Sequence, residues 1–351
     1  MYSFLEVQPP VRGPADGRSL VVVFRLVAVA AMFGVLGACG GGGGGNAPMP
    51  PPPAPSPSGP LDAVMSVPDP VGYDADRLAA FNRLNEIRLS AGLGMLAQNR
   101  LMDQAAQAHA DWEIANNAYD HVERAGTVGF TGAEWWDREE ALGYTPLEGA
   151  EILSSGYAAA SAVDVLVNVV YHRIGILTME NVEVGIGRSS QMVPNVAQPL
   201  VIDSAVPEGD AIRGQGQLPQ AAINGVAVWP RDGAQGVLMR MGGEVPSPAP
   251  GLDIQQLGTP ISLTVANSRA IDSASFVVTN IVAGSPVQTR LLNHRNDPNL
   301  LVPASYIAAI PTAPLNPNTT YSVAFSGSLT DLSTGTASTL VRNWQFTTGA
   351  Q

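Results

Sequence analysis

The fold of this chain is decided by four strings: NNAYDH at 116–121, GAEI at 149–152, YHRIGIL at 171–177 and EVGIG at 183–187. The first three contain His121, Glu151 and His172, side chains that can bind a metal or move a proton. The third string ends a helix-like apolar run, and the last alternates as a strand does. A His–Glu–His set spread from 121 to 172 is ambiguous by itself, so its neighbours must decide what it is.

Two helices are predicted upstream of these strings. LNEIRLSAGLGML at 84–96 continues a helical pattern that begins at Asp76, and its glycines end the helix. AAQAHADWEIANNAYDH at 105–121 belongs to a second helix, predicted over 99–117. The apolar stripe of the first helix is predicted to be Leu78, Phe81, Leu84 and Ile87.

Together these strings resemble the bacterial branch of the CAP superfamily (cysteine-rich secretory proteins, antigen 5 and pathogenesis-related proteins; the SCP domain). The resemblance covers roughly 73–206. A third helix is predicted over 160–171, followed by strands at 182–186 and 199–206. We therefore expect an α+β protein whose first domain, 61–208, is an α–β–α sandwich with helices on both faces of a small sheet.

The resemblance implies a ligand-binding cleft formed by His121, Glu151, His172 and Arg173. Two neutral imidazoles could bind Zn²⁺ at an open site, with Glu151 as the catalytic base if the protein is a hydrolase. The same groups could instead form a polar cleft without metal or catalysis. His109 and Glu113 share a helix face, but a buried, hydrogen-bonded histidine is the favoured interpretation there.

The strings also depart from the family pattern. Val122 follows His121 where the family usually has Ser or Thr, and Tyr171 replaces the Gly before His172. AEIL at 150–153 stands where the family reads Gly-Glu-Asn-Ile, so the carboxylate is kept and the Asn is lost. These departures weaken the case for intact catalysis.

Residues 1–38 are predicted to be a lipoprotein signal peptide. Three Arg precede an apolar run at 26–38, which is short for a membrane span. LGAC at 36–39 resembles a lipobox, so Cys39, the only cysteine, is predicted to be lipidated. Residues 39–60, rich in Gly and Pro, are predicted to be a tether. The alternative is an uncleaved signal anchor beginning at Ser19.

Residues 209–258 are predicted to be a connector, because they are rich in Gly, Pro and Gln. From 259 to 351, short alternating segments indicate an all-β immunoglobulin-like sandwich. PLNPNTTYSV at 314–323 resembles a bacterial immunoglobulin-like module, with Tyr321 as a tyrosine-corner residue bonded near Leu315. We expect residues 61–208 to fold without this module.

The chain has a formal net charge of −12, and its 18 basic residues are all Arg. This excess of acid argues against nucleic acid as a partner. Nucleophilic catalysis has no candidate either, because the sequence has no Gly-x-Ser-x-Gly elbow, catalytic Cys or phosphate loop.

We therefore expect an exported cell-envelope protein, anchored to a bacterial membrane through lipidated Cys39 or exposed on the surface. It is expected to bind a lipid, a small ligand or an envelope component in the His/Glu cleft. The alternatives are a metal-dependent hydrolase using the same cleft and a non-catalytic structural envelope protein.

Overall fold

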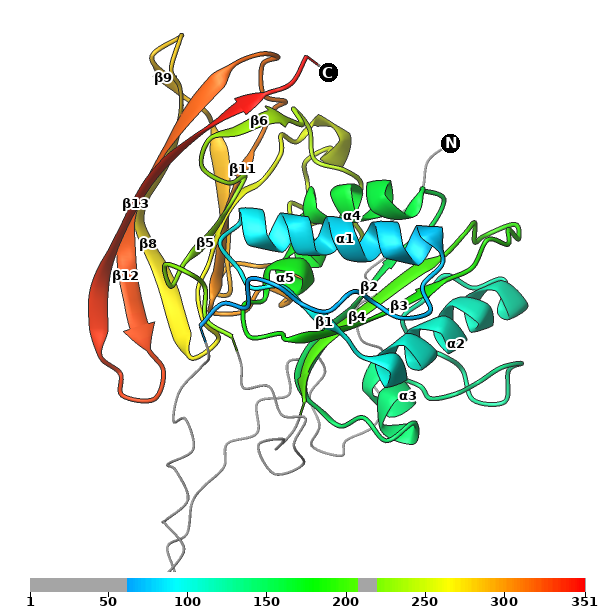
Figure 1. Ribbon diagram of the computed structural model, residues 1–351. Helices are drawn as coiled ribbons and strands as arrows, with labels where there is room; N and C mark the ends of the chain where they lie inside the picture. The colour runs from blue at the N-terminus through cyan, green and yellow to red at the C-terminus, as the bar shows by residue number, and fades with distance from the viewer. Residues whose placement is uncertain (1–61, 208–219, 351) are drawn as a thin grey trace, which may run out of the picture.

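The computed structural model describes residues 62–207 and 220–350 (Figure 1). The predicted signal peptide, Cys39 and the tether lie outside the described residues, as do residues 208–219, which include the beginning of the predicted connector. Over the two described ranges, no single helix is long and apolar enough to cross a membrane; one bent pair, at 159–177, passes that test by length and composition only.

The N-terminal domain is organised around a four-stranded sheet in the order β1–β3–β4–β2. β4 pairs antiparallel with both β2 and β3, and the short β1 pairs parallel with β3. The predicted pairing between the strands near 182–186 and 199–206 is therefore confirmed. The strands are β1 (Ala97–Gln98), β2 (Pro146–Ser154), β3 (Glu183–Arg188) and β4 (Leu200–Pro207).

Helices lie on both sides of this sheet (Figure 1). On one side, Ile152, Ile186 and Ile202 are aligned across β2, β3 and β4 and share an apolar core with α1, α4 and α5. On the other side, α2 packs against β3 and β4, and α3 packs against β2. The helices are α1 (Ala75–Ser90), α2 (Arg100–Asn116), α3 (Trp135–Ala141), α4 (Ala159–Val167) and α5 (Tyr171–Leu177).

Two glycines of β3 allow α2 to approach the sheet closely. A Cβ added to Gly185 would lie 2.2 Å from the main-chain carbon of Met102, and one added to Gly187 would lie 2.1 Å from the carbonyl oxygen of Ala106. Because alternate residues of a strand face opposite sides, Ile186 between them points to the other layer. The EVGIG string thus places one face of the strand against a helix backbone and the other in the apolar core.

The predicted third helix is two helices. α4 ends at Val167, and α5 begins at Tyr171 after a bend of 107°. Residues 174–177 belong to α5, and the next element along the chain is β3. A carboxylate distant in sequence, Glu244, accepts the main-chain N–H groups that begin α5 and so fixes its direction.

The C-terminal domain consists of two sheets, ordered β10–β11–β7–β5 and β6–β13–β12–β8–β9. The predicted tyrosine corner is confirmed, because the Asn316 N–H donates to the Tyr321 hydroxyl at 2.8 Å. The elements are β5 (Ala227–Trp229), β6 (Ala234–Val237), a 3₁₀ turn η1 (Ile254–Gln256), β7 (Ile261–Thr264), β8 (Arg269–Asn280), β9 (Ser285–Pro286), β10 (Thr289–Asn293), β11 (Tyr306–Pro311), β12 (Thr320–Asp331) and β13 (Ala337–Thr348).

The domain boundary expected at 259 needs correction. β5 is an edge strand of one sheet and β6 is an edge strand of the other, yet both lie in the predicted connector, 209–258. These strands pair with their neighbours over only a few residues, so they lack the long alternation that marks a strand in a sequence. The sandwich therefore begins before the predicted boundary.

The two domains share one apolar core. Tyr171 and Ile174 of α5 belong to the same buried cluster as Tyr306 and Ile310 of β11. Polar contacts add to it, because the side-chain amide of Gln220 donates to the main-chain oxygens of both Met95 and Asn181. This continuity argues against the expectation that residues 61–208 fold alone.

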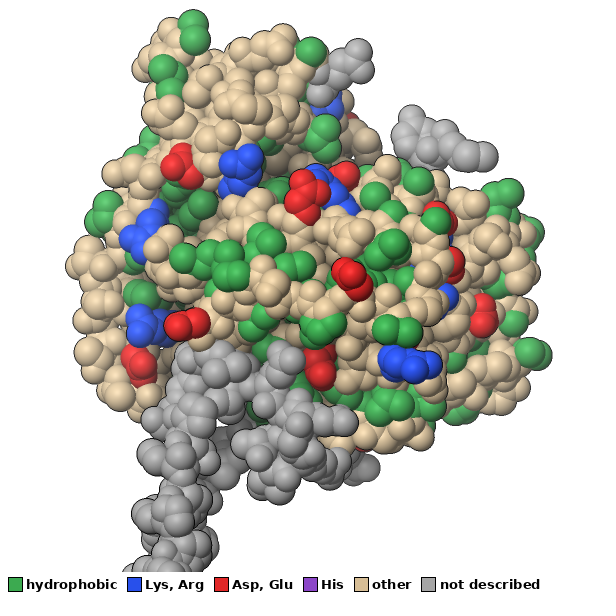
Figure 2. All heavy atoms as spheres, in the orientation of Figure 1, with side chains coloured by type: hydrophobic (Ala, Val, Ile, Leu, Met, Phe, Trp, Pro, Cys, Tyr) green, Lys and Arg blue, Asp and Glu red, His purple; other side chains and the backbone are tan. Residues whose placement is uncertain are grey.

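On the face drawn in Figure 2, basic and acidic side chains are interspersed rather than gathered by sign. Ion pairs between side chains add to this arrangement: Arg83 of α1 is 2.7 Å from Glu86 and 2.7 Å from Asp164 of α4. Such pairs cancel one another's field, so this face presents no large single-sign patch.

Candidate functional site

His121 lies in the loop that follows α2. The helix ends at Asn116 and is capped by Asn117, whose positive φ of 51° suits an asparagine. The Asn117 N–H donates to the carbonyl oxygens of Glu113 and Ile114. The loop then folds back over the helix, where the Trp112 indole N–H donates to the Thr127 hydroxyl at 2.8 Å. These contacts place His121 at the surface, with 22% of its side chain exposed.

The buried carboxylate of Glu151 contacts the His121 ring on the side of the protein interior. Nδ1 of His121 is 2.8 Å from Oε1 of Glu151, and Arg138 of α3 donates to Oε2 of the same carboxylate. Arg138 also donates to the main-chain oxygen of His121 at 3.3 Å. The side chains of Arg138 and Glu151 are almost completely buried. The three residues therefore form a hydrogen-bonded chain from the interior to the surface.

The charges of Arg138 and Glu151 determine which ring nitrogen of His121 carries the proton in its neutral form. Burial alone would raise the pKa of Glu151, but the charge of Arg138, assisted by His109 and His121, lowers that pKa below its usual range. The ionised carboxylate accepts the Nδ1–H of His121, and in the neutral form of the ring this bond makes Nε2 the acceptor. No described residue is hydrogen-bonded to Nε2, which leaves it available to a ligand hydroxyl or amide N–H.

Three more acids are buried around the ion pair. Asp203 lies opposite Glu151 in the β2–β4 register, while Glu139 comes from α3 and Glu113 from α2. Burial chiefly, and then the negative charge of a neighbouring acid, raises the pKa of each well above its usual range. Folding therefore favours the neutral form of each acid, which limits the cost of burying further unpaired charge beside Glu151.

His109 has the structural role that its helix position predicts. It is fully buried, with Nδ1 3.1 Å from Glu123 and Nε2 2.9 Å from the main-chain oxygen of Asp120. Its ring stacks on Trp112 with centroids 5.6 Å apart. Both ring nitrogens are occupied, and the partner is Glu123 rather than Glu113.

His172 and Arg173 lie at the junction of the two domains. Nδ1 of His172 is 2.9 Å from Oε1 of Glu244, and the ring is only 1% exposed. The Arg173 guanidinium donates to the main-chain oxygens of Val167 and Pro260, each at 2.7 Å. The structure thus joins His121 to Glu151, but it places His172 and Arg173 in a separate, buried network.

The residues present do not fit the predicted zinc site. In the part of the chain that the structure describes, no group of three or more His, Cys, Asp or Glu could hold a metal ion. Nδ1 of His121 is bonded to Glu151, and that carboxylate is bonded to Arg138. A zinc site with an open position needs three protein ligands, and these side chains do not supply them.

Three residues of these networks, Arg138, Asp203 and Glu244, were not predicted from the sequence. Arg138 sits in the acid-rich string WWDREEA, where it resembles a surface charge. Asp203 lies in the apolar strand LVIDSAVP, and a lone acid in a buried strand was the signal available in the sequence. Nothing in the Gly- and Pro-rich string around Glu244 marks it.

Comparison with known proteins agrees with the C-terminal fold. Residues 222–348 match the bacterial Ig-like domain family, so the C-terminal domain is Ig-like, and the match includes β5 and β6. No curated protein matches the chain.

The solved structures that match this chain include two with low TM-scores. One is an extracellular protein containing an SCP domain from Bacillus anthracis str. Ames, with 18% identity and a TM-score of 0.30, over 36% of this chain and 38% of that one. The other is an outer surface protein from Borrelia burgdorferi, with 17% identity and a TM-score of 0.32, over 37% of this chain and 91% of that one. The similarity to the first thus spans well under half of that protein's length.

Proposed function

We propose that this protein is an exported, lipid-anchored protein of the bacterial cell envelope that binds a ligand or an envelope partner at His121. The observation that carries the proposal is the Arg138–Glu151–His121 chain, in which only the imidazole reaches the surface. Helices on both faces of the sheet support a CAP-type α–β–α sandwich for the N-terminal domain. The Ig-like domain at 222–348 supports a surface location, and Cys39 is the proposed membrane anchor.

The surroundings of His121 favour an amphipathic ligand. The same loop exposes three apolar side chains: Val122 is 37% exposed, Val128 is 71% exposed and Phe130 is 39% exposed. A ligand that places a hydroxyl or amide N–H on Nε2 of His121 can cover some of this apolar surface with its remaining atoms. A lipid or an apolar part of an envelope component has this chemistry.

Binding is better supported than hydrolysis. A general base works best with a pKa near the working pH, whereas Arg138 lowers the pKa of Glu151 and makes it a weak base. The described residues also lack a three-ligand metal group. A purely structural role would not require an imidazole that is partly exposed and whose tautomer is fixed by a buried ion pair.

The proposal can be tested by co-sedimentation of a purified chain that lacks residues 1–39, so that neither the predicted signal peptide nor a lipid on Cys39 drives association. One arm uses cell-wall sacculi, and the other uses phosphatidylethanolamine–phosphatidylglycerol liposomes. We expect association in one arm and its loss in His121→Ala, while the matched control His294→Ala, a partly buried histidine of the C-terminal domain, keeps it. Equal association of His121→Ala and its parent, or no association in either arm, would contradict the proposal.

A further inference from the structure

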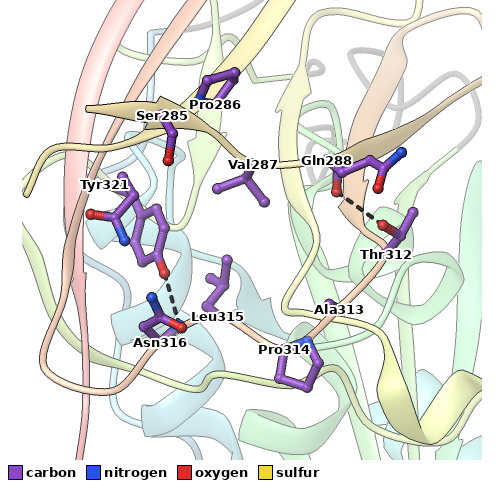
Figure 3. A pocket seen from close by; sticks show the side chains of 11 residues that line it. Ser285, Pro286, Val287, Gln288, Thr312, Ala313, Pro314, Leu315, Asn316 and Tyr321 are labelled. Carbon is purple, nitrogen blue, oxygen red and sulfur yellow. Dashed lines mark hydrogen bonds between the residues drawn. The ribbon is translucent and has the colours of Figure 1, made fainter. Parts of the chain in front are cut away.

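We propose that the C-terminal domain contains a second binding site, for a neutral saccharide, which is independent of His121. The site is a cavity of about 230 Å³ at one edge of the sandwich (Figure 3). Its lining residues are Asn280, Ser285–Gln288, Thr312–Asn316 and Tyr321.

The cavity forms where the chain crosses from one sheet to the other. β9 belongs to the five-stranded sheet and β10 to the four-stranded sheet, so residues 287–288 bridge their edges. The Val287 N–H donates to the oxygen of Val278 at 2.7 Å, which holds the crossing on one side. The oxygen of Gln288 accepts the Thr312 N–H at 3.0 Å, which holds it on the other. Main-chain bonds therefore fix the width of the opening.

The floor of the cavity is part of the domain core. Tyr321 and Leu315 are both almost completely buried, and the Tyr321 ring stacks on Phe346 with centroids 5.5 Å apart. The Tyr321 hydroxyl is held by the Asn316 N–H at 2.8 Å. Because these walls are already ordered, a ligand would not have to order them on binding.

The rim carries polar side chains without partners in the protein. The side chains of Ser285, Gln288 and Asn316 make no hydrogen bond to any described residue, and all three residues are exposed. Figure 3 shows them spaced around the hollow, with Val287 and Leu315 between them. A hydroxyl and two amides each provide both a donor and an acceptor, which matches sugar hydroxyl groups.

The lining excludes charged ligands and favours a sugar. None of the lining residues carries a charge, so nothing there would balance a phosphate, a carboxylate or a cation. A wholly apolar ligand would displace water from the polar rim without replacing its hydrogen bonds. A sugar ring offers C–H faces to Val287, Leu315 and Pro314 and hydroxyls to the rim. The cavity is smaller than the roughly 300–1,000 Å³ of typical ligand sites, which suits one ring.

The test uses the full-length chain and saturation-transfer NMR with methyl glycosides of glucose, galactose, mannose and N-acetylglucosamine. We expect at least one of these to bind, and methyl glucuronide, which is charged, to bind more weakly. Ala313→Trp should abolish binding, because Ala313 is exposed and an indole there would cover the cavity without entering the core. Asn316→Ala and Gln288→Ala should each weaken binding by about twofold to tenfold, the range for one net hydrogen bond.

Controls keep this site distinct from His121. Asn224→Ala and Gln191→Ala remove exposed amides elsewhere on the surface and should leave affinity unchanged. His121→Ala should also bind the glycoside normally, so failure at one site does not imply failure at the other. If Ala313→Trp alters the circular dichroism spectrum, the Gln288→Ala/Asn316→Ala double variant decides instead. No binding by any neutral glycoside, preference for the glucuronide, or full affinity in the deciding variant would overturn the proposal.

Discussion

Glu244 and His172 are joined by two contacts: Oε1 of Glu244 accepts the His172 N–H at 3.1 Å and lies 2.9 Å from its Nδ1. The same carboxylate accepts the N–H groups of Val170 and Tyr171 at 2.9 and 2.7 Å. Glu244 is 72 residues from His172 in the sequence and follows β6 of the C-terminal domain. One buried side chain thus orders the start of α5 and links the two domains.

Removal of this carboxylate should destabilise the protein strongly. Glu244→Ala leaves several buried N–H groups without an acceptor, and each such group costs about 1–3 kcal/mol. We therefore expect the free energy of unfolding to fall by at least about 3 kcal/mol. Urea denaturation followed by circular dichroism measures this loss.

The matched control is Glu86→Ala, because the Glu86 side chain is 68% exposed and forms a surface ion pair with Arg83. Its effect should stay within about 1 kcal/mol. Similar losses in the two variants would show that the contacts of Glu244 contribute no more than a surface pair.

The Glu244–His172 contact also explains why half of the candidate site was not predictable. The string around His172 matches a family pattern, and such a pattern gives no information about a partner 72 residues away. His121 and Glu151 were expected to lie in one cleft, and their side chains are 2.8 Å apart. Arg138, which fixes the charge of Glu151, lies in a string whose acids make it resemble a surface helix.

The helices were predictable from periodicity, but the burial of individual residues was not. Phe81, Leu84 and Ile87 of α1 are buried as predicted, whereas Leu78 is 39% exposed. Arg88 lies outside the predicted apolar stripe, yet it is fully buried. Its guanidinium donates to four main-chain oxygens, those of Gly94, Ile176, Thr178 and Asn181. Hydropathy classes an arginine as exposed, and only the tertiary structure supplies those carbonyl groups.

The shared core predicts that the N-terminal domain depends on its neighbour. A fragment of residues 62–207 exposes apolar residues of α5 and leaves Arg173 without its contacts to Pro260 and Ser262. We expect the fragment to melt at a lower temperature than the same segment in the full chain, as followed by calorimetry. An equal melting temperature would show that the two domains are independent.

The Arg138–Glu151 pair should behave as a coupled unit. Arg138→Met leaves Glu151 as a buried, uncompensated charge, which costs about 3–5 kcal/mol. Adding Glu151→Gln to that variant removes the charge and should restore part of the stability. A double-mutant cycle, measured by urea denaturation, gives the coupling energy directly.

The pH dependence checks the same pair independently. Because the pKa of Glu151 is lowered in the folded state, the pair contributes stability above the unfolded pKa and loses it as the pH falls. The difference between wild type and the Arg138→Met variant should therefore shrink in acid. Strictly additive effects in the cycle, or a difference that does not change with pH, would contradict the ion pair.

Cys39 lies outside the described residues, and its lipidation stays a prediction from the sequence. Cys39→Ser should leave an unprocessed precursor and abolish metabolic labelling with palmitate. Ala38→Gly, which keeps a small residue before the cysteine, is the matched control and should be processed normally. Labelling that persists in Cys39→Ser would rule out this anchor.

Glu180 predicts a pH-dependent contact between the domains. Its carboxylate accepts the Asn267 N–H at 2.6 Å, and the Asn267 side chain donates to Glu148 at 3.1 Å. Burial, and then the charge of Glu148, raises the pKa of Glu180 from 4.5 to about 7, although the charge of Arg88 partly opposes this. Glu148 also has a raised pKa because of burial. Folding therefore favours the neutral form of both acids.

The sign of the effect follows from linkage. A group whose pKa is raised by folding contributes stability that is complete below its unfolded pKa and is lost as the pH rises through the folded pKa. Between pH 4.5 and about pH 7, Glu180 should therefore reduce the free energy of unfolding by up to about 3 kcal/mol. Glu180→Gln keeps an oxygen for the Asn267 N–H but cannot ionise. It should lie closest to wild type near pH 5 and exceed it by a growing margin up to pH 8.

Urea denaturation of wild type and Glu180→Gln at intervals from pH 5 to pH 8 measures the divergence. Glu86→Gln changes an exposed acid instead, and its curve should run parallel to that of wild type. Glu113, Glu139 and Asp203 also have raised pKa values, so wild type and both variants share their contribution, and it cancels in the comparison. Parallel curves for Glu180→Gln and wild type would mean that Glu180 is already ionised in the folded protein at pH 5, and that the contact with Asn267 does not respond to pH.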